Sequence, residues 1–209
     1  MIILGITGSV GTGKSFASTF FKKQRVPVFD SDHEVSLLYK KKKVLGIIMQ
    51  NFPKAFKKNK LIKEKLTKIV FQDKNKLLIL ENIIYKFLKE RRYKWIRKQF
   101  RNKSKFVVFD VPLLFEKDNI KKYDRIIAMA CSEKIQMARV LKRNGWDEKR
   151  FTQTKLLQMD DKKKIKLANN IIYSDRGKRI VYNKVYNILK KGSNLRKRTA
   201  NKILMDFNN

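Results

Sequence analysis

The chain has 209 residues, a formal net charge of +34 and a single cysteine, Cys131. One cysteine excludes an intramolecular disulfide, no apolar run approaches the length of a membrane span, and a glycine-rich motif begins too early for a cleavable signal sequence. We therefore expect a soluble, cytoplasmic protein with room for one α/β domain with insertions.

The N-terminal segment has the order expected of a phosphate-binding strand, turn and helix. Residues 2–6 form a short apolar run, which is typical of a parallel strand buried on both faces. Residues 8–15 read Gly-Ser-Val-Gly-Thr-Gly-Lys-Ser and fit G-x-x-x-x-G-K-[ST], the P-loop of nucleotide enzymes. The apolar residues that follow at helical spacing are Phe16, Ala17, Phe20 and Phe21. The alternative is that the motif is a glycine-rich turn that matches by chance. The apolar run before it and the helical pattern after it instead favour binding of a nucleoside triphosphate.

Each part of this motif has a physical role in holding a triphosphate. The glycines let backbone N–H groups approach an anion, and the following helix points its positive end at that anion. Lys14 can reach the terminal phosphates, and the Ser15 hydroxyl can ligate Mg²⁺. The residues expected to contact ATP are Gly11, Thr12, Gly13, Lys14, Ser15 and Phe16.

Four further strands are predicted, and helical patterns separate them. They are Val26–Phe29, Phe106–Phe109, Arg125–Ala130 and Ile171–Tyr173. A repeated β-α order predicts a five-stranded parallel sheet flanked by helices, which is an α/β fold.

A long gap between the second and third predicted strands indicates a mostly helical insertion. It contains helical patterns at 33–50 and 61–72, a polar stretch near 53–60 and a long helix from about 75 to 101. No Pro/Gly/Ser-rich linker interrupts the chain, so we expect one domain over 1–209. Its expected parts are a core (about 1–32, 103–138 and 166–191), the insertion (33–102), a lid (139–165) and a basic tail (192–209), in which a short helix is an option.

Two predicted strands end in carboxylates, in Asp30-Ser31-Asp32 and at Asp110. Ligands of parallel sheets bind beyond the carboxyl ends of the strands, so these acids should project beside the P-loop. Asp110 suits the holding of Mg²⁺, and an acid near an acceptor hydroxyl can take its proton. The alternative is that the acids cap the following helices. We favour function for Asp32 and Asp110, and for Asp30 both interpretations stay open.

Two arginines follow the fourth predicted strand at a spacing of four. Arg139 and Arg143 would lie on one face of a helix and could fold over the triphosphate as part of a lid, neutralising charge on the transferring group. A solvated helix is an equally good interpretation in a chain this basic.

The net charge of +34 suggests a nucleic-acid partner, but its pattern favours a compositional cause. Lysine supplies 39 of the 52 cationic side chains, and the lysines spread through almost every segment. No helix-turn-helix, zinc-finger or RNA-binding signature is present. We therefore expect no specific nucleic-acid partner.

The sequence resembles dephospho-CoA kinase over residues 2 to about 177. The resemblance rests on the P-loop, on Asp30-Ser31-Asp32 at the second strand end, and on Gln136, Arg139 and Arg143 at the spacing of the family's lid. Its most family-specific segment is Asp110-Val111-Pro112-Leu113-Leu114-Phe115-Glu116. Further similar positions are 61–71, Gln158-Met159, Lys164 and Ala168.

This resemblance implies a P-loop kinase fold and ATP-dependent phosphorylation of the ribose 3′-hydroxyl of dephospho-CoA. It implies Asp32 as the base and Arg139 as a catalytic lid arginine. Together with the motif and the strand-end acids, we expect Lys14 to be catalytic as well, Arg143 to contact the nucleotide, and Mg²⁺ to bind at Ser15 and Asp110. Dephospho-CoA would bind at the helical insertion, and adenine near 174–177. Another small-molecule kinase, such as a nucleoside monophosphate kinase, and a basic P-loop ATPase that binds nucleic acid remain the alternatives. The oligomeric state is undetermined.

The sequence departs from the family pattern at several places. Ser36 replaces an arginine, Tyr85-Lys86 replaces a His-Pro pair, and Phe16 stands where Ser or Thr is usual. Asn169 and Ser174 differ from the family's Asp and Asn. The P-loop, the strand-end acids and both lid arginines remain, so we expect an active enzyme with altered substrate contacts.

Overall fold

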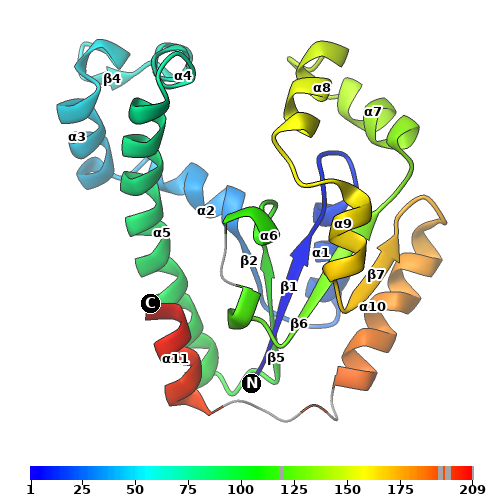
Figure 1. Cartoon of the computed structure of the whole chain (residues 1–209). Coiled ribbons are helices and arrows are strands. Elements are labelled where there is room, and N and C mark those ends of the chain that lie inside the picture. Colours follow the sequence, from blue (N-terminus) through cyan, green and yellow to red (C-terminus); the bar gives the residue numbers. More distant parts are fainter. Residues whose placement is uncertain (118–119, 193–194, 196–198, 209) are drawn as a thin grey trace. The chain divides into compact units, whose positions relative to one another are not determined.

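A computed structural model describes residues 1–117, 120–192, 195 and 199–208, and it divides into two compact units. The larger unit comprises Met1–Asp30 and Ile96–Asn209, and the smaller comprises Ser31–Trp95. Figure 1 shows the elements of each unit. The predicted division into core, insertion, lid and tail stays a prediction.

The larger unit is built on a five-stranded parallel sheet, as predicted. Its strands are β1 (Ile2–Thr7), β2 (Val28–Asp30), β5 (Phe106–Asp110), β6 (Arg125–Ala130) and β7 (Asn170–Tyr173). The order across the sheet is β2-β5-β1-β6-β7. All six residues of β1 are buried, because this apolar strand lies at the centre with helices on both faces.

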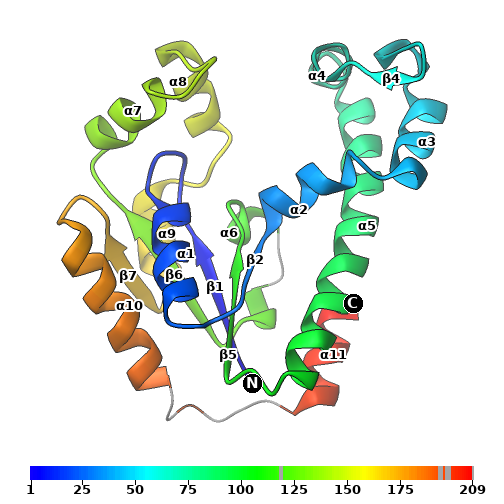
Figure 2. The ribbon, with the colours of Figure 1, turned by 180° about the vertical axis from the view of Figure 1, so that it is seen from behind.

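Helices cover both faces of this sheet, and Figures 1 and 2 show α1 and α9 on opposite faces. Besides the last turns of α5, the helical elements of the unit are α1 (Lys14–Lys23), α6 (Leu114–Lys117), η2 (Ile120–Lys122), α7 (Glu133–Leu141), α8 (Glu148–Leu156), α9 (Asp161–Leu167), α10 (Lys178–Gly192) and α11 (Ala200–Asn208). Phe20 and Phe21 of α1 join Val181 and Val185 of α10 in the main apolar core. The predicted apolar spacing in α1 therefore serves packing against the sheet.

The end of the chain forms a short helix, α11. Phe207 is only 2% exposed and stacks on Phe109 of β5, with ring centroids 4.9 Å apart. The Nζ atom of Lys122 lies 5.8 Å from the centre of the Phe207 ring. This helix is thus part of the larger unit and contributes to its core.

The smaller unit is mostly helical, as predicted, and also contains a short β-hairpin. Its elements are α2 (Ser31–Leu38), α3 (Lys42–Asn51), η1 (Pro53–Ala55), β3 (Phe56–Lys57), β4 (Lys60–Leu61), α4 (Lys63–Phe71) and most of α5 (Lys74–Arg101). Lys58 and Asn59 both have positive φ (47° and 62°), which matches the twist of a two-residue hairpin. The sequence predicts only a polar stretch near 53–60, because Lys58-Asn59 lacks the glycine that usually marks such a turn.

None of the helices in the described part of the chain has the length and apolar character needed to cross a lipid bilayer.

Candidate active site

The P-loop joins β1 to α1 as a tight turn that only glycines allow. The φ angles of Gly11 and Gly13 are +79° and +90°, in the left-handed region. A Cβ atom on Gly11 would also lie 2.6 Å from the carbonyl oxygen of Gln136, so the loop packs directly on the backbone of α7. Inside the loop, the Ser9 carbonyl accepts hydrogen bonds from the Thr12 amide (3.2 Å) and hydroxyl (2.7 Å).

The first turn of α1 carries the two side chains that the motif assigns to phosphate and metal. Lys14 is half-buried and donates a hydrogen bond to the Gly8 carbonyl (2.9 Å), while Ser15 is exposed. The N-cap residue of this helix is Gly13, which has no side chain that could accept hydrogen bonds from the first amides of the helix. An anion can therefore accept them instead. This arrangement can bind the phosphates of a nucleotide.

Asp110 lies beside the P-loop helix at the carboxyl end of β5. It is 4% exposed and accepts a 2.9 Å hydrogen bond from the Ser18 hydroxyl of α1. Asp30 is its neighbour on β2, because the two residues are paired in the strand register. Asp32 is exposed in the first turn of α2 and belongs to the smaller unit. Its predicted role as the base stays a prediction.

The hydroxyl oxygen of Ser15 and the carboxylate oxygens of Asp110 suit Mg²⁺, a hard cation that prefers oxygen ligands. In the described chain no group of three His, Cys, Asp or Glu side chains could by itself hold a metal. Mg²⁺ in kinases is bound by one or two protein oxygens together with waters and substrate phosphates, so these residues are chemically sufficient.

The structure brings Arg139 to the P-loop. Its Nη1 donates to the Gly11 carbonyl (3.2 Å) and to the Ser174 hydroxyl (2.7 Å), and its Nη2 donates to the Ser174 carbonyl (3.1 Å). The guanidinium therefore connects α7, the loop and the end of β7. Its predicted role in neutralising charge on the transferring group stays a prediction.

Arg143 does not share a helical face with Arg139, and that prediction was wrong. Helix α7 ends at Leu141, and Arg143 lies beyond it in an exposed turn. The turn runs into Gly145, whose φ of +74° cannot continue a helix. The predicted contact between Arg143 and the nucleotide stays a prediction.

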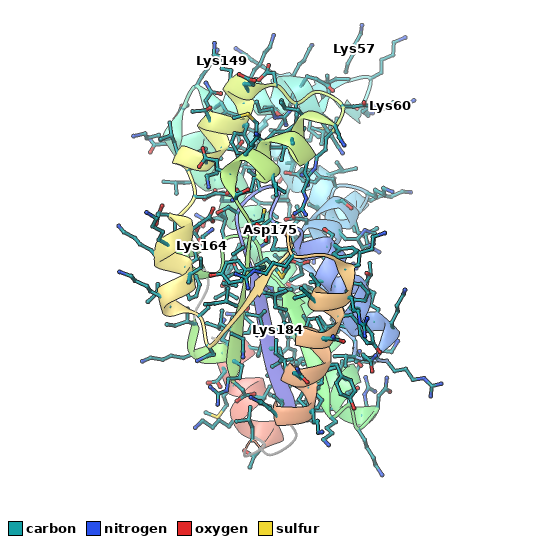
Figure 3. The ribbon with its side chains drawn as sticks, turned by 90° about the vertical axis from the view of Figure 1, so that its right-hand side faces the viewer. Lys57, Lys60, Lys149, Lys164, Asp175 and Lys184 are labelled. Carbon is teal, nitrogen blue, oxygen red and sulfur yellow. The ribbon has the colours of Figure 1, made fainter. Side chains whose placement is uncertain are left out.

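A buried ion pair beside the P-loop was not anticipated from the sequence. Lys164 of α9 is 1% exposed, and its Nζ lies 2.9 Å from Glu116 Oε1 and 3.4 Å from Ser9 Oγ. Figure 3 shows Lys164 on the sheet side of α9, whereas Lys149 projects outward from α8. Glu116 Oε1 also accepts from the Met159 amide (2.8 Å). The resemblance includes both Lys164 and Glu116, but only the fold shows that they pair.

Asp161 was missed altogether, although three side chains beside the loop donate hydrogen bonds to its carboxylate. Its carboxylate accepts hydrogen bonds from Ser9, Gln136 and Lys155. The sequence offered a weak signal, since Asp160-Asp161 precedes a helical pattern and either acid could be a helix cap.

The segment after β7, where adenine is expected, lies against the start of α7. Asp175, labelled in Figure 3, accepts a hydrogen bond from the Ser132 amide (3.2 Å), and Arg176 stacks over the Tyr173 ring. Cys131 is half-buried nearby, and burial raises the pKa of its thiol despite the adjacent Arg139. A protonated thiol is a poor nucleophile, so the surroundings of this cysteine do not activate it as one.

Comparison with known proteins decides the family. The model of the dephospho-CoA kinase family (CoaE) matches residues 2–179. The chain belongs to the dephospho-CoA kinase family. The dephospho-CoA kinase of Bartonella quintana (strain Toulouse) is 37% identical over 189 residues, which cover 90% of this chain and 97% of the relative.

Solved structures confirm the predicted P-loop kinase fold. TT1252 from Thermus thermophilus superposes with a TM-score of 0.81 at 24% identity, covering 91% of this chain and 97% of that chain. Dephospho-CoA kinase from Campylobacter jejuni gives a TM-score of 0.66 at 19% identity, covering 91% and 96%. As a member of this kinase family, the chain uses ATP as its co-substrate.

Proposed function

We propose that this chain transfers the γ-phosphoryl group of ATP to the ribose 3′-hydroxyl of dephospho-CoA, giving coenzyme A and ADP. The bond between the γ-phosphorus and the bridging oxygen of ATP breaks, and a bond to the acceptor oxygen forms. The observation that carries the proposal is the family match over residues 2–179, which includes both the P-loop and the Asp110–Glu116 segment.

We propose roles for individual side chains from the motif, the family resemblance and, for Arg139, its contacts with the P-loop. Lys14 and the backbone of 11–16 hold the phosphates, and Arg139 stabilises charge on the transferring group from its position against Gly11. Asp32 orients the 3′-hydroxyl and takes its proton. Arg143 provides a further nucleotide contact.

We also propose Mg²⁺ as the metal cofactor, with Ser15 and Asp110 as its protein ligands. Mg²⁺ would supply neutralisation of the phosphate charge. The buried hydrogen bond from Ser18 to Asp110 Oδ2 supports this role, because it fixes the carboxylate beside the first turn of α1. A cytoplasmic location is proposed as well, and the unpaired thiol of Cys131 supports it.

The departures from the family pattern point to altered acceptor contacts. Ser36 donates its hydroxyl to the His33 carbonyl of its own helix, and Tyr85 is 44% exposed on α5. Neither side chain reproduces the charge of an arginine or imidazole. We therefore propose a KM for dephospho-CoA that is higher than in relatives with those groups.

An ADP-release assay tests the function. Purified protein receives ATP and Mg²⁺ with dephospho-CoA, AMP or single-stranded RNA as the second substrate. We expect strong stimulation by dephospho-CoA only, and chromatography should show stoichiometric coenzyme A. The Lys14→Ala variant is the control for a contaminating ATPase. Stimulation by AMP would instead indicate a nucleoside monophosphate kinase, and stimulation by RNA alone would indicate a nucleic-acid-dependent ATPase.

A further inference from the structure

Ser9 controls the shape of the first half of the P-loop. Its carbonyl oxygen closes the turn by accepting two hydrogen bonds from Thr12. Its hydroxyl donates to Oδ1 of Asp161 at 2.5 Å, a partner 152 positions further along the chain. Because these hydrogen bonds join Ser9 to the rest of the turn, a contact that holds the Ser9 hydroxyl also positions the loop.

The other oxygen of Asp161 is held by two different helices. Oδ2 accepts from Gln136 Nε2 of α7 and from Lys155 Nζ of α8, both at 2.8 Å. Gln136 is 1% exposed, and its backbone is the surface on which Gly11 packs. The Asp161 carboxylate therefore joins the P-loop to α7 and α8.

Capping of α9 does not explain Asp161. The N-cap of α9 is Asp160, whose carboxylate accepts from the amides of Lys162 and Lys163. Asp161 is the first residue of the helix, and its carboxylate bonds elsewhere, to the P-loop, α7 and α8. The two adjacent acids thus have separate tasks, which gives a matched pair for experiment.

We propose that Asp161 is a positioning residue for nucleotide binding, which holds Ser9 and the P-loop against α7 and α8 in the shape that accepts phosphates. It acts through Ser9 and does not touch the nucleotide. The inference rests on the proposed function only in requiring that the P-loop binds a nucleotide.

Calorimetric titration with ADP in excess Mg²⁺ provides the test, since ADP binding needs no acceptor substrate. Asp161→Asn keeps the shape but replaces one acceptor oxygen by a donor that faces other donors. We expect its Kd for ADP to rise about tenfold, a size typical of a lost hydrogen bond to a charged group. Asp160→Asn removes the neighbouring charge but keeps an oxygen that can cap α9, so it should leave the Kd within about twofold.

Ser9→Ala supplies a second variant that removes one hydroxyl from the same contact. We expect a several-fold rise in Kd, and the double variant Ser9→Ala/Asp161→Asn should bind no more weakly than Asp161→Asn alone. In turnover assays KM for ATP should rise, while kcat at saturating ATP should change little.

Three outcomes would overturn the proposal. They are a wild-type Kd in Asp161→Asn, equal weakening in Asp160→Asn, and fully additive effects in the double variant. If Asp161→Asn does not fold, Ser9→Ala decides, and a wild-type Kd there also overturns the proposal. Normal ADP binding without dephospho-CoA turnover would refute the proposed substrate and leave this test intact.

Discussion

Arg139 and Ser174 are joined by two hydrogen bonds, from Nη1 to the hydroxyl at 2.7 Å and from Nη2 to the carbonyl at 3.1 Å. Ser174 is one of the positions at which we expect this sequence to depart from its family's pattern. The serine nevertheless anchors Arg139 against the P-loop. Two groups of Ser174 therefore hold Arg139. A substitution can remove the hydroxyl, whereas the backbone carbonyl stays in any variant.

Ser174→Ala should therefore weaken catalysis only in part. With the carbonyl contact retained, we expect kcat/KM for ATP to fall about threefold to tenfold. Arg139→Met removes the charge as well and should lower kcat about a hundredfold or more. Steady-state kinetics at varied ATP measures both effects. Thr152→Ala is a suitable control, because the Thr152 hydroxyl bonds to Glu148 within its own helix. Equal losses in Ser174→Ala and Arg139→Met would contradict this division.

Asp32→Asn should separate chemistry from nucleotide binding. The amide preserves shape but removes the base, so kcat should fall roughly a hundredfold or more while the Kd for ATP changes little. Lys14→Ala should harm both, since in the proposed function Lys14 holds the phosphates before and during transfer. Asp73→Asn, which alters an exposed acid at the start of α5, controls for a general charge effect. A near-normal kcat in Asp32→Asn would make Asp32 a structural residue and Asp110 the next candidate.

The stability provided by Asp161 should depend on pH. Burial raises the pKa of this carboxyl, but hydrogen bonds from Lys155, Ser9 and Gln136 outweigh burial and hold the pKa below its ordinary value. The other charges near this cluster are Lys164 at Ser9 and Glu133 at Lys155.

A carboxyl with a lowered pKa stabilises the fold above its unfolded pKa of about 3.9, and this stabilisation is lost as pH falls through the folded value. The melting-temperature difference between wild type and Asp161→Asn should thus be full at pH 5 to 7 and shrink below about pH 4. Thermal unfolding across this pH range measures it. A difference that grows on acidification would show that the carboxylate is not held as described.

The lysine excess should produce only weak and salt-sensitive binding to nucleic acid. If the charge is compositional, binding should be indifferent to sequence and mostly lost at physiological salt, because released counterions make such contacts steeply dependent on ionic strength. Kinase activity should persist, since the P-loop binds through directional hydrogen bonds. A labelled oligonucleotide and the turnover assay, followed through one salt series, measure both. Tight, sequence-selective binding at physiological salt would contradict the compositional explanation.

The sequence alone determined the elements that depend on local patterns. The P-loop is contiguous, so its glycines, Lys14 and Ser15 could be assigned roles from spacing. Apolar runs of strand length identified all five parallel strands, and their β-α order identified the sheet. Asp110 could be predicted to lie near the P-loop, because the carboxyl ends of parallel strands all lie at the same edge of the sheet.

Tertiary structure decided the contacts between segments far apart in the chain. Ser9 meets Asp161, and Arg139 meets Ser174, through helix packing and strand register that no local pattern encodes. The end of α7 at Leu141, which leaves Arg143 outside the helix, was likewise seen only in the structure, because a spacing of four between two arginines does not fix where a helix stops. A buried polar side chain takes whichever partner the assembled fold presents, so its partner can be known only when the fold is known.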